Sequence, residues 1–475
     1  MKIAMISIEM VPFSKVGGLA DVMGSLPQAI LSLNNHISVI TPHYGKITEN
    51  LYSKFFDKKI ETQEIKTLSI LNYQIKICKT SFKDVEVFLI CNEHLFEREG
   101  IYLDKNGKPF EDEILRYFVF SSAAIEIAQN YDIIHCHDWH TAFTIALAKL
   151  KNLKNTVFTI HNIAYQGIIE KEKLEFIKDQ DLKKLIFENG EYYGKINLMK
   201  SAIILADIVT TVSPTYAYEI QNFPQFGMGL ENILKENSHK LYGILNGIDY
   251  ELWNPQNDKH IFQNFSVSSI QEGKKANKEK LLENLGLKNT DTLFGIVARL
   301  DHQKGFDILY QAVENLESGS FNLVVLGTGN PEIQNSILEL SKKYKDFIYV
   351  NIAFDESLAR KIYAASDYFL IPSRFEPCGL SQMISYRYAT IPIATKTGGL
   401  KDSIIDIFED PQNGTGLLIE KADSFLLSQA MKKAIELPKE KLFNLREKVF
   451  NLDFSWKTSA KKYIEIYEKL VTKIK

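Results

Sequence analysis

The amino-acid sequence predicts an α/β protein with two doubly wound parallel-sheet domains. Short, nearly continuous apolar runs alternate with helical patterns, and the alternation restarts after a polar, turn-rich segment at residues 246–255. Apolar strands separated by helices are typical of parallel sheets that helices cover on both faces. The chain has 475 residues, which is too many for one ordinary hydrophobic core and fits two large α/β domains.

The first domain is expected to span residues 1–245. The apolar runs predict strands at residues 2–8, 37–40, 85–91, 133–135, 157–160 and 208–212. Helical periodicity connects several of these strands, as at residues 20–33 and 116–129.

The second domain is expected to span residues 246–455. A lysine-rich helix at residues 274–285 precedes strands predicted at residues 293–298, 322–326, 347–350, 368–371 and 391–394, with helical patterns at 306–316 and 331–344. The last segment, residues 456–475, predicts an amphipathic helix with an apolar stripe of Ala460, Tyr463, Ile464, Tyr467 and Leu470. We expect this helix to pack back on the first domain.

The composition favours a reduced, cytoplasmic enzyme. With a net charge of -3 and no run of basic residues, the sequence gives no reason to expect a nucleic-acid or membrane partner. Its four cysteines are too few and too scattered for a disulfide scaffold. The apolar N-terminus is interrupted by Glu9, which argues against a signal peptide, and no apolar stretch approaches the ~20 residues of a membrane span.

A glycine pair follows the first predicted strand. Gly17 and Gly18 stand just before a helical pattern, where glycine lets the backbone approach a ligand and the helix start offers free N–H groups to an anion. Lys15 adds a positive charge. The same residues would also suit a plain strand-to-helix loop, so this loop alone leaves both interpretations open.

Histidines gather at the ends of two predicted strands. His135, His137 and His140 invite a metal interpretation, but we expect the first two to face opposite sides of their strand, and no distant Cys/His set completes a site. We therefore expect no metal. Together with His161 and Asn162 after the next strand, this cluster indicates a pocket for substrate hydroxyls.

In the second domain, Arg299 and Lys304 lie five residues apart after a predicted strand. They could bracket a diphosphate, or they could form a solvated basic turn. Glycine loops at residues 326–329 and 397–400 are weak signals of the same kind. Glu376 adds a carboxylate next to a helix start at residues 379–380, which suggests contact with sugar hydroxyls.

Taken together, these segments resemble a known family. The shared segments, in order, are KVGGLAD at 15–21, HDWH at 137–140, HNIAYQG at 161–167, TVSPTY at 211–216, GILNGID at 243–249, WNP at 253–255, RLDHQKG at 299–305, EPCGL at 376–380 and TGGL at 397–400. They resemble the bacterial glycogen synthases and plant starch synthases of glycosyltransferase family 5. The resemblance runs from about residue 3 to Tyr467, which is nearly the whole chain.

The resemblance implies a GT-B fold, in which two Rossmann-like domains face a deep cleft. It implies a starch synthase catalytic domain on the acceptor side, followed by a domain that binds the nucleotide sugar. The expected reaction transfers glucose from ADP-glucose to the 4-OH at the non-reducing end of an α-1,4-glucan such as glycogen, with retention. No metal, other cofactor or side-chain nucleophile is expected.

The resemblance also assigns roles to individual residues. The residues implied to act on the reacting groups are His161, Arg299, Lys304 and Glu376. Those implied to bind the donor nucleotide are Lys15, Gly17, Gly18, Asp21, Phe354, Cys378, Gly379, Leu380, Thr397, Gly398 and Gly399. Those implied to line the sugar and acceptor side are Tyr102, Asp138, His140, Asn162, Tyr165 and Asn246.

Three positions depart from the family pattern. Val16 replaces a threonine, Phe354 replaces the tyrosine that stacks on adenine, and Leu417 replaces an aromatic residue. Two other functions stay open at this point: a retaining GT-B enzyme that uses UDP-glucose or a small acceptor, and an inactive glucan-binding protein. The intact cations and glycine loops argue against the second of these. The sequence leaves open whether the chain forms a homo-oligomer.

Overall fold

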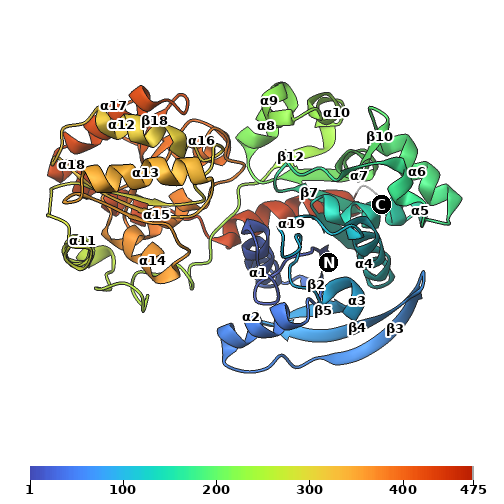
Figure 1. The fold of residues 1–475 in the computed structure, drawn as a ribbon. Helices are drawn as coiled ribbons and strands as arrows, with labels where there is room; N and C mark the ends of the chain where they lie inside the picture. The colour runs from blue at the N-terminus through green and yellow to red at the C-terminus, as the bar shows by residue number, and fades with distance from the viewer. Residues whose placement is uncertain (473–475) are drawn as a thin grey trace. The chain divides into compact units, whose positions relative to one another are not determined.

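The computed structural model describes residues 1–472, and they form two compact units (Figure 1). Unit 1 comprises Met1–Asn246 together with the residues from Trp456 onward, and unit 2 comprises Gly247–Ser455. No helix among the described residues is long and apolar enough to cross a membrane.

Unit 1 is built on a nine-stranded sheet with the order β12-β11-β7-β6-β1-β2-β5-β4-β3. Its strands are β1 (Lys2–Ile6), β2 (His36–Pro42), β3 (Gln63–Ile70), β4 (Tyr73–Phe82), β5 (Val85–Cys91), β6 (Ile133–His137), β7 (Thr156–Ile160), β11 (Ile208–Thr211) and β12 (Leu241–Gly243). All neighbouring pairs from β12 to β5 are parallel. β1, β6 and β7 are almost wholly buried, because helices cover both faces of the sheet.

The edge of this sheet differs from the all-parallel arrangement that we expected. β3 and β4 form an antiparallel hairpin, and β4 pairs antiparallel with β5. The sequence did not reveal this hairpin, because β3 is largely exposed and β4 alternates exposed and buried residues instead of forming an apolar run. Such alternation is typical of an antiparallel strand with one face in solvent.

Helices complete unit 1 around the sheet (Figure 1). They are α1 (Gly18–Leu31), α2 (Lys46–Phe56), α3 (Glu93–Phe96), α4 (Glu113–Ala128), α5 (Ala142–Leu150), α6 (Gln180–Gly190), α7 (Leu198–Leu205), α8 (Pro214–Asn222), α9 (Pro224–Gly227) and α10 (Glu231–Glu236), with 3₁₀ turns η1 (Trp139–Thr141), η2 (Lys171–Leu174) and η3 (Ser238–Lys240). A small antiparallel sheet of β8 (Ile168–Ile169), β10 (Lys195–Asn197) and β9 (Glu191–Tyr192) lies beside α6.

The C-terminal helix α19 (Trp456–Thr472) belongs to unit 1 and packs against α1. Ala460, Tyr463 and Tyr467 are fully buried in the unit 1 core. The Tyr467 hydroxyl lies 2.7 Å from Nδ1 of His135 on β6, so the helix is tied to the centre of the sheet by a hydrogen bond as well as by apolar packing. The last three residues of the helix that we expected, 473–475, lie outside the described residues.

Unit 2 contains a six-stranded parallel sheet with the order β15-β14-β13-β16-β17-β18. Its strands are β13 (Leu293–Val297), β14 (Asn322–Leu326), β15 (Ile348–Asn351), β16 (Tyr368–Ile371), β17 (Ile391–Thr395) and β18 (Leu417–Ile419). Leu417, one of the departures from the family pattern, is a buried residue of β18.

The helices of unit 2 cover both faces of its sheet (Figure 1). They are η4 (Val267–Ser269), α11 (Ile270–Asn284), η5 (Phe306–Ile308), α12 (Leu309–Glu314), α13 (Pro331–Lys343), α14 (Glu356–Ala365), α15 (Ser381–Arg387), α16 (Gly398–Ser403), α17 (Ser424–Ile435) and α18 (Lys439–Phe450). The single helix expected at 306–316 is in fact η5 followed by α12.

In both units the strand order reverses at one point. The chain of unit 1 runs outward from β1 to β2 and β5, and then returns to the other side of β1 for β6, β7 and β11. Unit 2 does the same at β13 and β16. Open α/β sheets bind ligands beyond the carboxyl ends of the strands at such a reversal. The loops after β1, β6, β13 and β16 are therefore the places to look for functional side chains.

The docking of α19 leads to a stability prediction. Tyr467→Ala should destabilise unit 1 by about 3–5 kcal/mol because it leaves a large cavity, whereas Tyr467→Phe should cost about 1–3 kcal/mol because it leaves a buried His135 nitrogen without its partner. Urea unfolding measures both changes in the free energy of unfolding, and hydrogen exchange of the β6 amides provides a second measurement. Lys462→Ala, on the exposed side of α19, is the control, and equal stability of the Tyr467→Ala and Lys462→Ala variants would contradict the prediction.

Candidate active site

The loop after β1 is organised by Glu9, a residue that the sequence did not single out as functional. Its Oε2 atom accepts hydrogen bonds from the backbone N–H groups of Val16 and Gly17, at 2.5 and 3.0 Å. Its Oε1 atom accepts a hydrogen bond from the Tyr102 hydroxyl. The only sequence signal for this role was an acidic residue at the end of an apolar strand. Glu9 thus joins the glycine loop to Tyr102, which the family resemblance places near the sugar.

The glycines of this loop are not required by packing. A Cβ atom added at Gly17 or Gly18 would meet no atom within 4 Å, and neither residue has a positive φ angle. The loop therefore has room for a ligand close to its backbone. Lys15 supplies a cation there, and its Nζ atom lies 2.6 Å from Oδ1 of Asp21. The Val16 side chain is 62% exposed, so this departure from the family pattern leaves the backbone contact with Glu9 intact.

The histidines of β6 share one face of the strand, which corrects our expectation of opposite faces. The rings of His135 and His137 are 4.2 Å apart, because residues two positions apart in a strand point the same way. His137 Nδ1 lies 2.9 Å from His161 Nε2 at the end of β7. No group of three His, Cys, Asp or Glu residues in the described part of the chain has the geometry to hold a metal ion.

Burial keeps these histidines neutral. It lowers the pKa values of His135, His140 and His161 to about 3 each, and it lowers that of His137 well below its usual value. They can therefore donate or accept hydrogen bonds near neutral pH, but they cannot supply positive charge to a phosphate. Since His161 Nε2 is engaged by His137, Nδ1 is the His161 ring nitrogen left for a substrate hydroxyl.

Asp138 closes the end of β6 in an unusual conformation. Its φ angle is 59°, in the left-handed region that non-glycine residues seldom adopt. The conformation is fixed because its N–H donates to the carbonyl of Thr159 (2.9 Å) and its Oδ1 accepts from the N–H of His161 (2.8 Å). Burial raises the pKa of Asp138 to about 7. Backbone strain and a shifted pKa at one residue are both frequent at functional sites.

Several residues that end or follow strands of the unit 1 sheet have unused polar atoms. The His140 ring lies 5.2 Å from that of Tyr102. Among the described residues, His137 Nε2, His140 Nδ1 and Asn246 Oδ1 are buried without a hydrogen-bond partner. Buried polar atoms of this kind require an explanation, and a bound sugar would provide one. Tyr165 is 62% exposed and can offer its ring to a ligand.

Asn162 is the remaining expected residue of unit 1. Its Oδ1 accepts a hydrogen bond from the N–H of Ala164 at 3.0 Å, which shapes the loop after β7. Within unit 1, the structure connects most of the expected residues through Glu9, Asp138 and the histidine pair.

In unit 2, Lys304 and Glu376 form the centre of the candidate site. Lys304 Nζ lies 2.6 Å from Glu376 Oε2, which also accepts a hydrogen bond from Ser373 Oγ at 2.9 Å. The backbone N–H of Lys304 donates to Asp301 Oδ1 at 2.8 Å. Lys304 follows β13 and Glu376 follows β16, so the reversal of strand order brings the two together. The sequence did not identify Ser373 or Asp301 as part of this arrangement.

Arg299 is placed differently from Lys304. Its side chain is 63% exposed, and Nη2 lies 3.4 Å from Asp301 Oδ2. This weak surface contact leaves the guanidinium available to an anion. Of the two cations that we expected to act together, one is therefore held by a carboxylate and the other is largely in solvent.

The loop at residues 376–380 packs directly on the glycine loop at residues 397–400. The N–H of Gly399 donates to the carbonyl of Glu376 at 3.1 Å, and a Cβ atom on Gly399 would lie 1.9 Å from the Cys378 carbonyl oxygen. Gln382 also holds the loop at residues 376–380, because its Nε2 donates to the carbonyls of Cys378 and Gly379. Close packing thus explains Gly399. It also shows how the expected donor residues are gathered around Glu376.

The expected residues of these loops share one location, the carboxyl edge of the unit 2 sheet. They are Cys378, Gly379, Leu380, Thr397, Gly398 and Gly399. Phe354, between β15 and α14, is 93% exposed. Its ring is accessible for stacking with a planar base.

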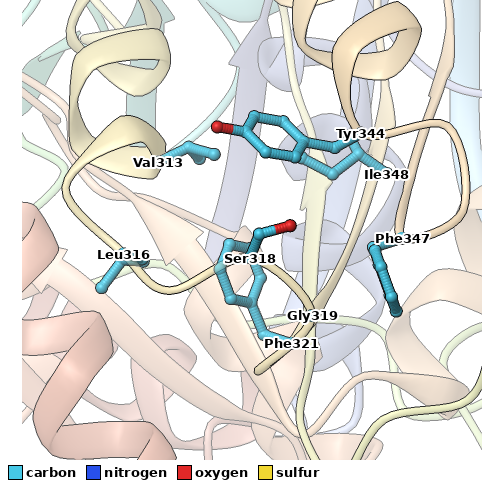
Figure 2. Close-up of a pocket in the computed structure, with 8 residues that line it drawn as sticks. All are labelled: Val313, Leu316, Ser318, Gly319, Phe321, Tyr344, Phe347 and Ile348. Carbon is cyan, nitrogen blue, oxygen red and sulfur yellow. The ribbon is translucent and has the colours of Figure 1, made fainter.

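Figure 2 shows an apolar hollow in unit 2. It is lined by Val313, Leu316, Ser318, Gly319, Phe321, Tyr344, Phe347 and Ile348. Phe321 and Phe347 immediately precede β14 and β15, so the hollow lies at the amino edge of the sheet. It is therefore unconnected with the chemistry at the carboxyl edge.

Comparison with known proteins agrees with this geometry. Residues 2–236 match the family described as "Starch synthase catalytic domain", and residues 277–450 match "Glycosyl transferases group 1". The chain is 40% identical to a glycogen synthase of Fervidobacterium nodosum, with all of both chains covered. It is 37% identical to that of Thermodesulfovibrio yellowstonii, covering 99% of this chain and 98% of the relative.

Solved structures show the same relationship. The catalytic domain of starch synthase IV from Arabidopsis thaliana, bound to ADP and acarbose, is 35% identical with a TM-score of 0.86, and 99% of each chain is covered. A sucrose-phosphate synthase from Thermosynechococcus elongatus shares the fold at 16% identity, with a TM-score of 0.61 and 99% of each chain covered.

The two sheets, the residues at their reversal points and these similarities define a glycosyltransferase with two Rossmann-like domains, the GT-B class. Within that class, the chain belongs to the glycogen synthase and starch synthase family, glycosyltransferase family 5.

The raised pKa of Asp138 leads to a pH prediction. A carboxyl whose pKa rises from 3.8 to about 7 on folding binds more protons in the folded chain, so its contribution to stability is lost as pH increases through that window. Asp138→Asn removes this dependence and keeps an oxygen for the His161 N–H. The stability of the wild type relative to this variant should therefore fall between pH 4 and pH 7 in urea titrations.

Asp84→Asn is the matched control for this titration. Asp84 also has a left-handed φ angle, of 65°, but it is exposed in a hairpin turn. A wild-type stability that changes with pH in the same way relative to both variants would show that Asp138 is not the group responsible.

Proposed function

We propose that the chain transfers glucose from ADP-glucose to the non-reducing 4-OH of an α-1,4-glucan, with retention at the anomeric carbon, and so elongates glycogen and releases ADP. The Lys304–Glu376 ion pair at the strand reversal of unit 2 carries this proposal. The preference for ADP is supported by the ADP that the Arabidopsis thaliana starch synthase IV structure contains. We also infer a cytoplasmic location, because a charged nucleotide sugar does not cross membranes freely.

The chemistry of bond cleavage fits the charges on unit 2. When the bond between glucose and the diphosphate breaks, negative charge develops on the leaving group and must be stabilised by fixed donors or cations. Lys304 and the exposed Arg299 are cations after β13, and Lys15 is a cation beside the glycine loop of unit 1. The buried histidines are neutral, so these side chains supply the positive charge in this proposal.

The Lys304–Glu376 pair suggests a division of roles. Glu376 is 7% exposed and is fixed by Lys304 and Ser373. A carboxylate held in this way can accept hydrogen bonds from glucose hydroxyls while the lysine faces the phosphate. On the acceptor side, we assign sugar contacts to Asn246, His140 and His161, which carry buried or site-facing polar atoms.

A donor and acceptor assay tests this function directly. The purified full-length chain is supplied with ADP-glucose or UDP-glucose, each with glycogen or with a short sugar acceptor. We expect transfer from ADP-glucose to glycogen. Preference for UDP-glucose or for the small sugar would assign a different GT-B activity, and the absence of transfer from every donor would leave a glucan-binding protein instead.

Loss of the central lysine gives a quantitative prediction. Lys304→Ala should lower kcat by about 10²–10³-fold, the usual effect of removing one group that stabilises developing charge. Steady-state kinetics with ADP-glucose and glycogen measure the change, and thermal unfolding checks that the variant is folded. Lys343→Ala removes a lysine that is likewise paired with a glutamate, Glu314, but on the surface of α13. Near-normal turnover by a folded Lys304→Ala variant would refute the assigned role.

A further inference from the structure

Glu9 is a buried carboxylate with both oxygens engaged by the protein. The residue is 2% exposed. Oε2 accepts from the N–H groups of Val16 and Gly17, and Oε1 accepts from the hydroxyl of Tyr102. Hydrogen bonds to an ionised acceptor are about twice as strong as neutral ones. A carboxylate enclosed in this way has little surface left for a substrate, so any effect on the reaction must pass through the groups that it holds.

These contacts divide the N–H groups of the glycine loop into two pairs. Those of Val16 and Gly17 are satisfied by Glu9. Those of Gly18 and Leu19 begin α1, and residues 1–472 provide no hydrogen-bond acceptor for either of them. The first N–H groups of a helix have no partner within the helix, and together with the helix dipole they favour an anion.

The alternative to Glu9 as hydrogen-bond acceptor for the Val16 and Gly17 N–H groups would be the ligand itself. Without Glu9, all four N–H groups would be free, and the loop could meet a phosphate through either pair. Because a Cβ atom at Gly17 or Gly18 would meet no atom within 4 Å, packing around these glycines does not choose between these arrangements. The Glu9 carboxylate decides between them, because it accepts hydrogen bonds from the Val16 and Gly17 N–H groups and leaves those of Gly18 and Leu19 for the phosphate.

We propose that Glu9 is a positioning residue for the donor diphosphate: it holds the loop so that the N–H groups of Gly18 and Leu19, with Lys15, receive the phosphates. The inference rests on the proposed function, which brings a nucleotide diphosphate to this loop. Donors fixed before the ligand arrives need no reorganisation during the reaction, which is how positioning contributes to rate and affinity. The same carboxylate also binds the Tyr102 hydroxyl, and so links this side chain to the loop.

Amide exchange of the ligand-free protein tests the hold on the loop. Glu9→Ala should speed exchange of the Val16 and Gly17 amides at least tenfold, read from peptides that cover residues 10–20. Glu86→Ala is the matched control, since Glu86 also accepts hydrogen bonds from a tyrosine and a serine, Tyr131 and Ser38, but lies on β5 away from the loop. Unchanged exchange at Val16 and Gly17 in the Glu9 variant would overturn the proposal.

Kinetics and binding test the consequence for the donor. Glu9→Ala should raise KM for ADP-glucose and Kd for ADP at least tenfold, because the loop that receives the diphosphate is no longer held. Glu9→Gln should restore most of this loss, because its amide oxygen can still accept from the loop and its amino group can donate to Tyr102. A positioning role therefore predicts rescue by glutamine, whereas a role for the negative charge in the reaction predicts equal loss in both variants and would overturn the assignment.

Two further comparisons separate the ways in which the idea could fail. If Glu9→Ala does not fold, Tyr102→Phe removes one of the three contacts and should still speed loop exchange measurably; no change would count against the proposal. If the wild type does not use ADP-glucose, the proposed function fails, while the exchange experiment still reports whether Glu9 holds the loop. Tight ADP binding in a Glu9→Ala variant with a loosened loop would overturn the positioning role alone.

Discussion

The reversal of strand order at β1/β6 and at β13/β16 is the constraint on which the site residues depend. The loops after two neighbouring strands diverge there, and each sheet leaves its carboxyl edge open instead of covering it with its own crossover. Asp138 and the glycine loop come from one reversal, whereas Lys304 and Glu376 come from the other. Within each unit, residues that are distant in sequence therefore lie near each other because of topology, and the local loop geometry then orients their side chains.

Burial then determines which side chains carry charge. In unit 1 it makes the histidines neutral and raises the pKa of Asp138, so this part of the site provides neutral hydrogen-bonding rings beside a carboxyl group with a raised pKa. In unit 2 the buried Glu376 keeps its place beside a lysine, and Arg299 stays in solvent. Different degrees of burial thus give unit 1 a group of neutral polar side chains suited to hydroxyls and unit 2 a group of charged side chains suited to phosphates.

The sequence was sufficient for features that depend on local pattern. β6, β7 and β14 were predictable because burial on both faces of a parallel sheet requires an unbroken apolar run. The β3–β4 hairpin was not, since exposed edge strands carry no such run. We expected His135 and His137 on opposite faces of β6, and this was wrong. The two-residue period of a strand places both side chains on the same face.

The candidate site shows the same limit. The loops with Lys15, His161, Lys304 and Glu376 could be located because glycines and charges cluster after apolar strands. Glu9 could not be assigned a role, since its partner Tyr102 lies 93 positions along the chain. Nothing in local pattern indicates which of two distant residues will share a buried hydrogen bond, and the same holds for His135 and Tyr467, separated by 332 positions.

The return of α19 to unit 1 has a consequence for how the chain is made. Unit 2 is an insertion within unit 1, and its two connecting segments are hydrogen-bonded to each other, with the N–H of Ile248 donating to the carbonyl of Phe454. During synthesis on the ribosome, unit 2 is complete before the last helix of unit 1 emerges. The face of α1 that α19 covers therefore stays uncovered while unit 2 is being made, and apolar surface that is transiently exposed in this way is prone to aggregation.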